Sequence, residues 1–503
     1  MFFKKKKADS LNSLNQENIE KRELIPAHTD GFIQEMKSRL HNSADLNIKN
    51  RSNGVTLIFL DTLIDNKMLN EDILARLQHG ESSLDEILKK ITVSKVAKYF
   101  YIEDAVETML KGAVLIHLSG HPCIVSASIG TQENRSLTRP ENESQVLGPQ
   151  IAFNESLTTN ISLIRRFLAN PNLCNESYSL GKQTNSGVSL LYMRGIADEE
   201  MVDRLRERIK NIKVDSILDS STLVQLIEDN SFGIFPQMLM TERPDRACAW
   251  LLNGKMIVLV DGSVQVIGCP HTFIEFFQSM EDESVRWQIA TFLRLLRIFS
   301  MIVSIFFTAI YVAALTFHYE IIPQTLLIPL GESRSKVPFP PIIEALLLEA
   351  MIELLREAGA RLPTKVGQTM GIVGGIVVGT AAVDAGFTSN ILIIIIAVSA
   401  LASFTTPNYM MGNVIRVLRF PLILLAGFWG FYGLMIGFCF LLIHLIRLSS
   451  LGTPFLAPFY PPRFADWRDS IIRLPIQFTN MRPLQTRPQN RMKYRFNKSK
   501  KKE

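Results

Sequence analysis

Residues 298–317, IFSMIVSIFFTAIYVAALTF, form a run of twenty residues without a charged side chain. At a helical rise of about 1.5 Å per residue, such a run crosses a hydrocarbon layer of about 30 Å. Arg294 and Arg297 stand just before it, and positive residues beside a span favour its cytoplasmic end. The sequence therefore predicts a membrane-spanning helix that begins on the cytoplasmic side.

Three further apolar segments follow this run. Residues 420–446 contain no Asp, Glu, Lys or Arg, and their glycines allow the close approach of a second helix. Residues 370–388 and 391–406 are predicted to form a helical hairpin about a turn at residues 386–390. We therefore expect an α-helical polytopic membrane domain over residues 286–450, with about four spanning helices. An even number of crossings leaves both ends of the chain in the cytoplasm.

One helix in this region departs from the apolar pattern. Residues 344–365, EALLLEAMIELLREAGARLPTK, carry glutamates among apolar side chains. Glu349, Glu353 and Glu357 are spaced by four residues and fall on one stripe of a helix, whereas Glu344 lies on the opposite side. The stripe either faces water from a helix in the membrane interface, or lines a wet passage where helices from several subunits meet.

The second interpretation predicts an ion pathway. Rings of carboxylates select cations in channels, and ionisable residues at membrane depth mark ion pathways. A glycine-rich run at residues 371–382 is an alternative lining that would form a narrow apolar gate. The candidate pore-lining residues are Glu349, Glu353, Glu357, Gly375, Val378 and Asp384.

The charged N-terminal half contains an internal repeat. A strand–turn–helix pattern begins at residue 55 and again at residue 188. A strand–glycine turn–strand pattern begins at Gly112 and again at Gly254. Because the two patterns recur in the same order, the sequence predicts two related α/β subdomains. Their predicted bounds are residues 51–180 and 181–285.

Charge and cysteine content limit the function of the remaining segments. Residues 1–50 are polar and predicted to be a mobile arm, and residues 451–503 are predicted to be a cytoplasmic basic tail. The net charge of +6 comes largely from these two ends and suits an anionic membrane surface better than a nucleic-acid groove.

The five cysteines lack metal-binding spacing, and we interpret them as reduced thiols. No catalytic constellation, cofactor motif or metal site emerges, so the sequence predicts neither an enzyme nor a cofactor.

Several short blocks occur in the order found in one protein family. They are TERPD at 241–245, FFQSMED at 276–282, FLRLLR at 292–297, VPFP at 337–340, ELLREAGARLP at 353–363, GIVGGIVVG at 371–379, SFTTPNY at 403–409 and LGTPFLAP at 451–458. With these blocks, the chain from about Val55 to Pro475 resembles the A subunit of the spore nutrient germinant receptors, the GerA family. The family usually has a tyrosine pair after the FFQSMED block, where this chain has Glu283 and Ser284. This departure falls at the expected junction of the soluble and membrane domains.

The resemblance implies an integral, multi-pass protein of the spore inner membrane, with its N-terminal domain and C-terminal tail in the cytoplasm. It implies a homo-oligomer, a pentamer, that forms a ligand-gated channel and releases monovalent cations when the nutrient is sensed. The implied partners are a transporter-like B subunit that binds the nutrient, a lipoprotein C subunit, a clustering lipoprotein and membrane lipids, but no nucleic acid. Two alternatives stay open: a channel of a related branch that acts with dipicolinate-release proteins, and a non-conducting signalling scaffold.

Overall fold

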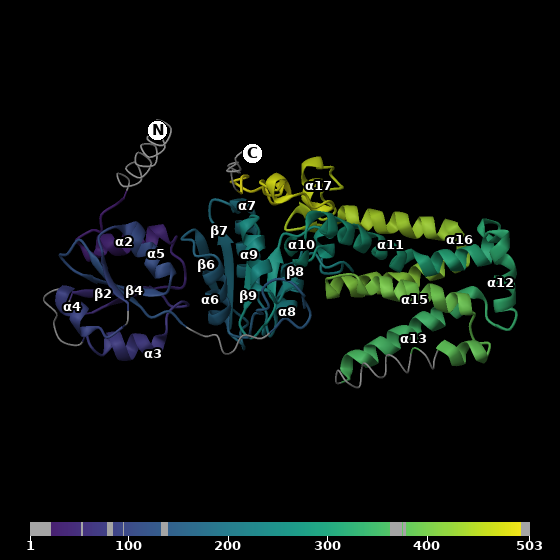
Figure 1. The fold of residues 1–503 in the computed structure, drawn as a ribbon, viewed down its shortest axis with the longest axis horizontal. Helices are drawn as coiled ribbons and strands as arrows, with labels where there is room; N and C mark the ends of the chain where they lie inside the picture. Colours follow the sequence, from purple (N-terminus) through teal and green to yellow (C-terminus); the bar gives the residue numbers. More distant parts are fainter. Residues whose placement is uncertain are drawn as a thin grey trace, which may run out of the picture.

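The structure is a computed structural model that describes residues 22–51, 54–77, 84–93, 95–131, 139–362, 375 and 379–493. Two sheet-containing subdomains and a group of long helices follow one another along the longest axis of the molecule (Figure 1). The second subdomain lies between the first subdomain and the helices. An α/β N-terminal region followed by a helical region confirms the predicted fold class.

The first subdomain is a five-stranded antiparallel sheet covered on both faces. Its strand order is β1-β2-β4-β5-β3. The strands are β1 (Leu46–Asn50), β2 (Val55–Leu60), β3 (Val96–Tyr99), β4 (Ala113–Leu118) and β5 (Ile124–Ser128). The helices are α2 (Thr29–Arg39), α3 (Asn66–Met68), the π-helical turn η1 (Leu69–Leu74), α4 (Leu84–Lys90) and α5 (Ile102–Leu110). One core forms against α2 and α5, and a second forms against η1 and α4, so the central strands β2 and β4 are buried on both faces.

The second subdomain repeats this topology. Its strand order is β6-β7-β9-β10-β8, which matches the first sheet strand for strand. The strands are β6 (Leu173–Leu180), β7 (Ser186–Met193), β8 (Leu239–Thr241), β9 (Met256–Val260) and β10 (Val266–Cys269). The helices are α6 (Leu157–Phe167), α7 (Glu199–Asn211), α8 (Ser220–Ile227) and α9 (Pro244–Leu252). The prediction of two related subdomains therefore describes the chain correctly, although its boundaries need correction.

The structure moves both boundaries of the first subdomain. Part of the predicted arm, residues 1–50, belongs to the fold, because α2 packs on the sheet and β1 pairs with β2 along its whole length. The predicted boundary at residue 180 falls at the end of β6, which is the edge strand of the second sheet. Both errors have one cause. Edge strands expose one face to water, so their polar sequences lack the apolar signal of a central strand.

A buried ion pair joins the two subdomains. Arg165 on α6 is fully buried and donates to both carboxylate oxygens of Asp45, at 2.5 and 2.8 Å. It also donates to Ser43 Oγ at 2.8 Å, and the backbone N–H of Ala44 donates to the carbonyl of Asn175 at 2.8 Å. A buried bidentate pair with further hydrogen bonds fixes the orientation of the two partners as well as their distance.

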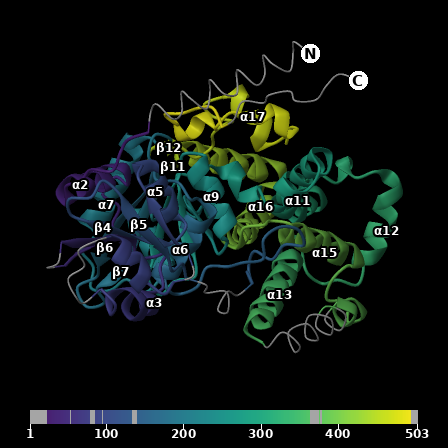
Figure 2. The same ribbon diagram turned by 60° about the vertical axis from the view of Figure 1, so that its left-hand side comes forward.

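A group of helices forms the other end of the molecule, and the longest of them run alongside one another (Figures 1 and 2). They are α11 (Trp287–Phe317), α12 (Gln324–Arg334), α13 (Pro341–Arg361), α15 (Asn390–Phe404) and α16 (Tyr409–Arg447), with the short turns η2 (Phe273–Phe277), α10 (Glu281–Ser284) and η3 (Tyr319–Ile321). By length and composition, α11 and α16 can each cross a membrane, and α15 is a shorter apolar helix. Of the predicted segment 370–388, residues 370–374 and 376–378 lie outside the described residues.

The helix α16 reverses its direction at Gly430, which has a non-helical backbone with φ +60° and ψ −139°. A Cβ atom built on Gly437 would lie 2.6 Å from Cδ2 of Leu422. In a straight helix, fifteen residues would separate these two positions by about 22 Å. The segment is therefore a helical hairpin, and the predicted single span over residues 420–446 is wrong. Because both arms are apolar, composition alone does not reveal a turn that depends on one left-handed glycine.

The C-terminal segment is folded against the second subdomain. It contains β11 (Ser449–Ser450), β12 (Thr453–Pro454), α17 (Phe464–Ser470) and the turns η4 (Ile476–Phe478) and η5 (Leu484–Thr486). Leu451 and Phe455 are fully buried in the cores of the second subdomain. Arg482 and Thr486 donate to the carbonyls of Leu252 and Asn253, at 2.6 and 2.8 Å. The described part of the predicted basic tail therefore packs across the surface of the second subdomain, and we call it a strap.

We predict that Gly430→Ala destabilises the hairpin of α16. A Cβ atom at this position would lie 2.7 Å from Cε1 of His318, and a left-handed non-glycine residue costs about 1–3 kcal/mol. The measurement is the temperature at which the detergent-solubilised protein loses half of its monodisperse size-exclusion peak. Gly331→Ala on α12 is the control, because a Cβ atom there meets no other atom within 4 Å. Equal thermal stability of the two variants would contradict the hairpin.

Candidate functional site

A buried ion pair connects α13 with the first arm of α16. Glu349 and Arg419 are each 1% exposed, and Arg419 Nη1 donates to Glu349 Oε2 at 3.0 Å. The other carboxylate oxygen, Oε1, accepts a hydrogen bond from Thr308 Oγ1 on α11 at 2.9 Å. Both oxygens of this carboxylate therefore have a partner inside the helical region.

The same arginine reaches two more helices. Arg419 Nη2 donates to Ser304 Oγ on α11 at 2.6 Å and to the carbonyl oxygen of Ser399 on α15 at 3.0 Å. Ser399 Oγ in turn donates to the carbonyl oxygen of Ser304 at 3.1 Å. Four helices thus share one polar cluster among apolar side chains. A charge at membrane depth is tolerated where it faces the bundle interior and is paired in this way.

The acidic stripe of α13 runs from the bundle interior to its surface. Beyond buried Glu349, the side chain of Glu353 is 25% exposed and pairs with Arg356 at 2.9 Å and with Arg416 of α16 at 3.5 Å. The side chain of Glu357 is 59% exposed and pairs with Arg361 at 2.6 Å. The first two acids therefore face arginines of α16, and the third reaches the surface of the protomer.

Glu344 has a separate buried position at the opposite end of α13. It is 1% exposed, and its Oε1 accepts hydrogen bonds from the backbone N–H of Ser389 at 2.6 Å and from Thr388 Oγ1 at 2.9 Å. Arg334 Nη2 lies 3.9 Å from its other oxygen. Because Ser389 is the N-cap of α15, this carboxylate binds the positive end of a helix.

The other candidate residues lie apart from this cluster. Gly375 and Asp384 are exposed, and a Cβ atom on Gly375 would meet no other atom within 4 Å. Val378 lies outside the described residues. Sequence reasoning missed Arg416 and Arg419, which stand just before the apolar run at 420–446. Their spacing of three residues places two positive charges on one helix face, a signal that matches the acidic stripe of α13.

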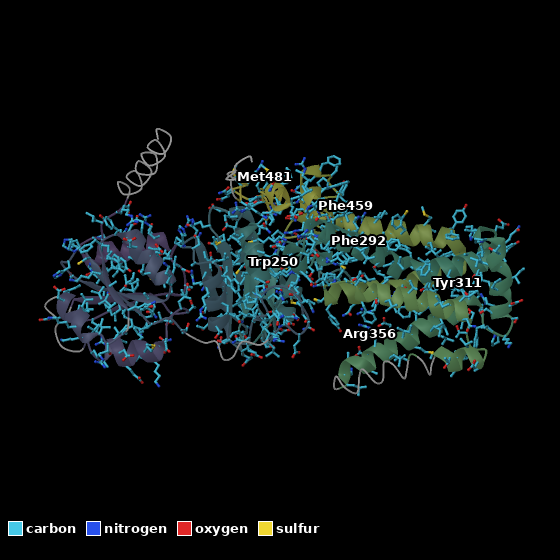
Figure 3. All side chains as sticks on the ribbon, viewed as in Figure 1. Trp250, Phe292, Tyr311, Arg356, Phe459 and Met481 are labelled. Carbon is cyan, nitrogen blue, oxygen red and sulfur yellow. The ribbon has the colours of Figure 1, made fainter. Side chains whose placement is uncertain are left out.

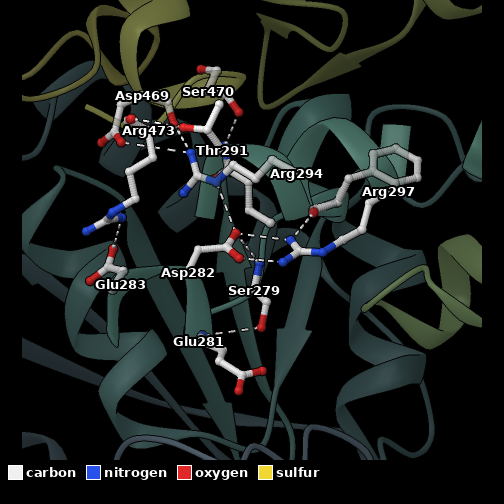
Figure 4. A network of polar contacts seen from close by, with 12 residues as sticks. Ser279, Glu281, Asp282, Glu283, Thr291, Arg294, Arg297, Asp469, Ser470 and Arg473 are labelled. Carbon is white, nitrogen blue, oxygen red and sulfur yellow. Dashed lines mark hydrogen bonds and ion pairs between the residues drawn. The ribbon is translucent and has the colours of Figure 1, made fainter. Parts of the chain in front are cut away.

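A second buried network joins the second subdomain to the helices (Figure 4). Asp282 is fully buried, and its Oδ2 accepts hydrogen bonds from Arg294 Nε and Arg297 Nη1, both at 3.0 Å. Arg297 Nη1 also donates to the carbonyl of Phe277 at 2.7 Å, and Arg294 donates to the carbonyl of Asp469. One carboxylate therefore binds the second subdomain to α11 and, through Arg294, to the C-terminal segment.

The two arginines determine the ionisation of Asp282. Burial raises the pKa of this carboxyl, but the hydrogen bonds and charge of Arg297 and the charge of Arg294 outweigh burial and hold it below its ordinary value. The ion pairs therefore contribute their full stabilisation above the unfolded pKa of about 3.9 and lose it as the pH falls through the lower folded value.

Comparisons with known proteins identify the family of the chain. The model of the Bacillus/Clostridium GerA spore germination protein matches residues 34–485. The chain belongs to the GerA family. Spore germination protein GerQA of Bacillus cereus is 45% identical over 94% of this chain and 95% of its own length. Spore germination protein KA of Bacillus subtilis is 38% identical over 93% of this chain and 88% of its own length.

Membership of the GerA family gives the role of the chain in outline. It is an A subunit of a spore germinant receptor, which implies a complex with other subunits, and its apolar helices suggest association with a membrane.

One solved structure is also similar, the N-terminal domain of the A subunit of the Bacillus megaterium spore germinant receptor GerK3. It is 26% identical, with a TM-score of 0.40, and covers 50% of this chain and 98% of that chain.

Sequence blocks of the GerA family make the contacts that join the domains. In the TERPD block, Thr241 donates to Glu143 Oε2 at 2.5 Å, and Arg243 donates to the carbonyl of Pro149 at 2.8 Å. The block thereby holds the connection between the two subdomains. At the departure from the family pattern, Glu283 lies 3.8 Å from Arg473, so it faces the C-terminal segment at the junction.

The described residues contain no group of three or more His, Cys, Asp or Glu side chains that could hold a metal ion. All five cysteines are free thiols, and four of them are buried. Burial raises the pKa of Cys248 and of Cys269 to about 12. These two thiols are therefore protonated and unreactive at neutral pH.

We predict that Arg419→Gln destabilises the helical region. The substitution leaves Glu349 buried without its charge partner, which costs about 3–5 kcal/mol. The double substitution Arg419→Met with Glu349→Met is expected to recover most of this loss, because it removes both buried charges. Thermal unfolding in detergent is the measurement. Arg361→Gln is the control, since its ion pair is exposed, and an equal effect of both arginine substitutions would contradict the buried pair.

We also predict that Asp282→Asn weakens the junction between the second subdomain and the helices. The amide leaves Arg294 and Arg297 without their buried counter-charge, which costs about 3–5 kcal/mol. Limited proteolysis is expected to cleave the C-terminal segment faster than in the unaltered protein. Glu281→Gln is the neighbouring control, because its side chain forms no ion pair among the described residues. Unchanged cleavage of Asp282→Asn would contradict a joining role for this network.

Proposed function

We propose that the chain is the pore-forming A subunit of a nutrient-responsive germinant receptor and acts as an oligomeric, ligand-gated channel for monovalent cations. The observation that carries this proposal is the acidic stripe of α13, which changes from a buried ion pair to a surface carboxylate along one helix. Carboxylates at membrane depth mark ion pathways, and a stripe that reaches a protomer surface becomes a ring when copies assemble around an axis.

The position of α13 supports an assembly of this kind. The helix lies at the lower edge of the helical region (Figure 1). Its outer side exposes Ile343, Leu347 and Leu354, at 44%, 38% and 70%. These apolar side chains form a face that a neighbouring copy can cover, while exposed Glu357 supplies a charge beside it. In a pentamer, each acidic position would give a ring of five carboxylates.

The proposal assigns different roles to the predicted pore-lining residues. Glu349 anchors α13 through Arg419, so its contribution to the pathway is structural. Glu353 and Glu357 line the cation pathway in this arrangement. Exposed Gly375 and Asp384 are further lining candidates.

The proposed receptor acts in the spore inner membrane. The second subdomain contacts both the start of α11, through Asp282, and the end of α16, where the ring of Phe235 lies 5.8 Å from that of His444. This arrangement supports an even number of crossings, with the N-terminal domain and the C-terminal segment both in the cytoplasm. The partners in this proposal are a transporter-like B subunit that binds the nutrient, a lipoprotein C subunit and a clustering lipoprotein.

The test is the double substitution Glu353→Gln with Glu357→Gln in the assembled receptor. Removing both charges is expected to slow nutrient-triggered potassium release or to change cation selectivity in planar bilayers, at unchanged receptor abundance. Glu349 stays intact in this variant, because neutralising it would leave Arg419 unpaired. A loss of conductance could then result from misfolding rather than from a change in the cation pathway. Glu332→Gln on α12 is the control, since it removes an exposed carboxylate away from the stripe.

Unaltered conductance in the assembled double variant would refute the assignment of these carboxylates to the pathway. A complete receptor without any nutrient-dependent conductance would favour the non-conducting scaffold instead.

A further inference from the structure

The C-terminal segment exposes many large apolar side chains close to the start of α11. Phe464 is 71% exposed, Ile476 and Phe478 are 65% exposed, and Tyr460 is 53% exposed. Clustered exposure of large apolar side chains is rare on a surface that faces water and marks contact with a membrane or a partner. We call residues 459–478, which carry these side chains, the aromatic segment.

Hydrogen bonds place the aromatic segment against the first turns of α11. Thr291 Oγ1 donates to the carbonyl of Arg473 at 3.1 Å, and Arg294 donates to the carbonyl of Asp469 (Figure 4). The neighbouring outer face of α11 is also apolar, with Phe292 exposed by 64% and Phe299 by 63%. Phe292 and Phe459 are both labelled at this end of the helical region in Figure 3. The aromatic segment therefore continues the outer face of a helix that can cross a membrane.

A loop of the second subdomain reaches the end of α16 in a similar way. Phe232 is 100% exposed and Ile234 is 42% exposed. The next residues tie this loop to the helix end, because a Cβ atom on Gly233 would lie 3.5 Å from Cδ2 of Leu448, and the ring of Phe235 contacts that of His444. Exposed apolar side chains of the C-terminal segment and of the second subdomain therefore lie beside the start of α11 and beside the end of α16.

Positive charge accompanies these aromatic side chains. Arg286 and Arg468 are exposed, and neither forms an ion pair with any residue that the structure describes. Aromatic rings favour the boundary between headgroups and acyl chains, and arginines beside them attract anionic headgroups. An interface with a second copy would instead be expected to pair these arginines with carboxylates.

We propose that the aromatic segment and the loop at residues 231–235 lie in the headgroup layer of the bilayer, as a collar around the cytoplasmic ends of α11 and α16. The occupant of this surface is the lipid bilayer, with anionic headgroups at Arg286 and Arg468. The collar fixes the depth of the helical region and the height of the second subdomain above the membrane. It does not depend on ion conduction, so it can fail or hold independently of the proposed channel.

Spin labels on the full-length protein in lipid nanodiscs test this proposal. The exposed thiol of Cys439 is first replaced by serine, and Phe464→Cys, Phe478→Cys and Phe232→Cys are labelled one at a time. We expect each label to collide more often with oxygen, which concentrates in the acyl layer, than with a water-soluble nickel complex. Phe100→Cys is the matched control, because Phe100 is a 51% exposed aromatic residue of the first subdomain, and that subdomain lies at the opposite end of the molecule from the helical region (Figure 1).

The lipid dependence of the signal tests the role of the arginines. Adding phosphatidylglycerol to phosphatidylcholine nanodiscs is expected to move the Phe464→Cys label deeper, and Arg468→Gln is expected to abolish this shift. Labels that collide mainly with nickel, like the Phe100 control, would overturn the proposal. Labels shielded from both reagents would also overturn it, because protein rather than lipid would then cover the surface.

Discussion

The ion pair between Glu349 and Arg419 sets the arrangement of the helices, because neither charge is tolerated among apolar side chains without the other. Two more buried carboxylate–arginine contacts stand at the other joints of the molecule. Asp45 and Arg165 join the two subdomains, and Asp282 joins the second subdomain to α11. A buried charge without its partner raises the free energy of the folded state. The carboxylate and the arginine at each joint therefore lose much of their stabilisation when they move apart by a few ångströms. Apolar packing alone would allow the domains to slide over one another, whereas these pairs specify one position.

The reversal of α16 at Gly430 makes this arrangement possible. The first arm brings Arg419 into the bundle, and the second arm returns the chain to the second subdomain, where Leu451 and Phe455 enter its cores. A straight helix of the same length would carry the chain about 58 Å away from the second subdomain. One left-handed glycine therefore determines whether the C-terminal segment can act as a strap and present its aromatic side chains beside α11.

Much of this architecture can be predicted from the sequence, and the failures have physical causes. The uncharged run at residues 298–317 and the repeated strand patterns are strong signals, because length and periodicity reflect burial directly. The sequence does not predict the strand β1, because the polar face of an edge strand gives it the composition of a disordered arm. The sequence does not predict the buried position of Arg419, because charged residues before an apolar run resemble the flank of a membrane span. Arg419 is buried in the bundle because α16 turns back at Gly430, and the amino-acid composition of the segment does not locate that turn.

The two networks of the helical region share one element, α11. Arg294 and Arg297 on its first turns bind Asp282, and Ser304 and Thr308 further along bind Arg419 and Glu349. From Arg297 to Thr308, the rise along the helix is about 16 Å, so one continuous helix connects the second subdomain with the acidic stripe of α13. Because a buried ion pair is stable only close to its paired geometry, both ends of this stretch of α11 are held in position by the same requirement. The requirement that buried charges be paired therefore fixes the second subdomain and the acidic stripe of α13 relative to one helix.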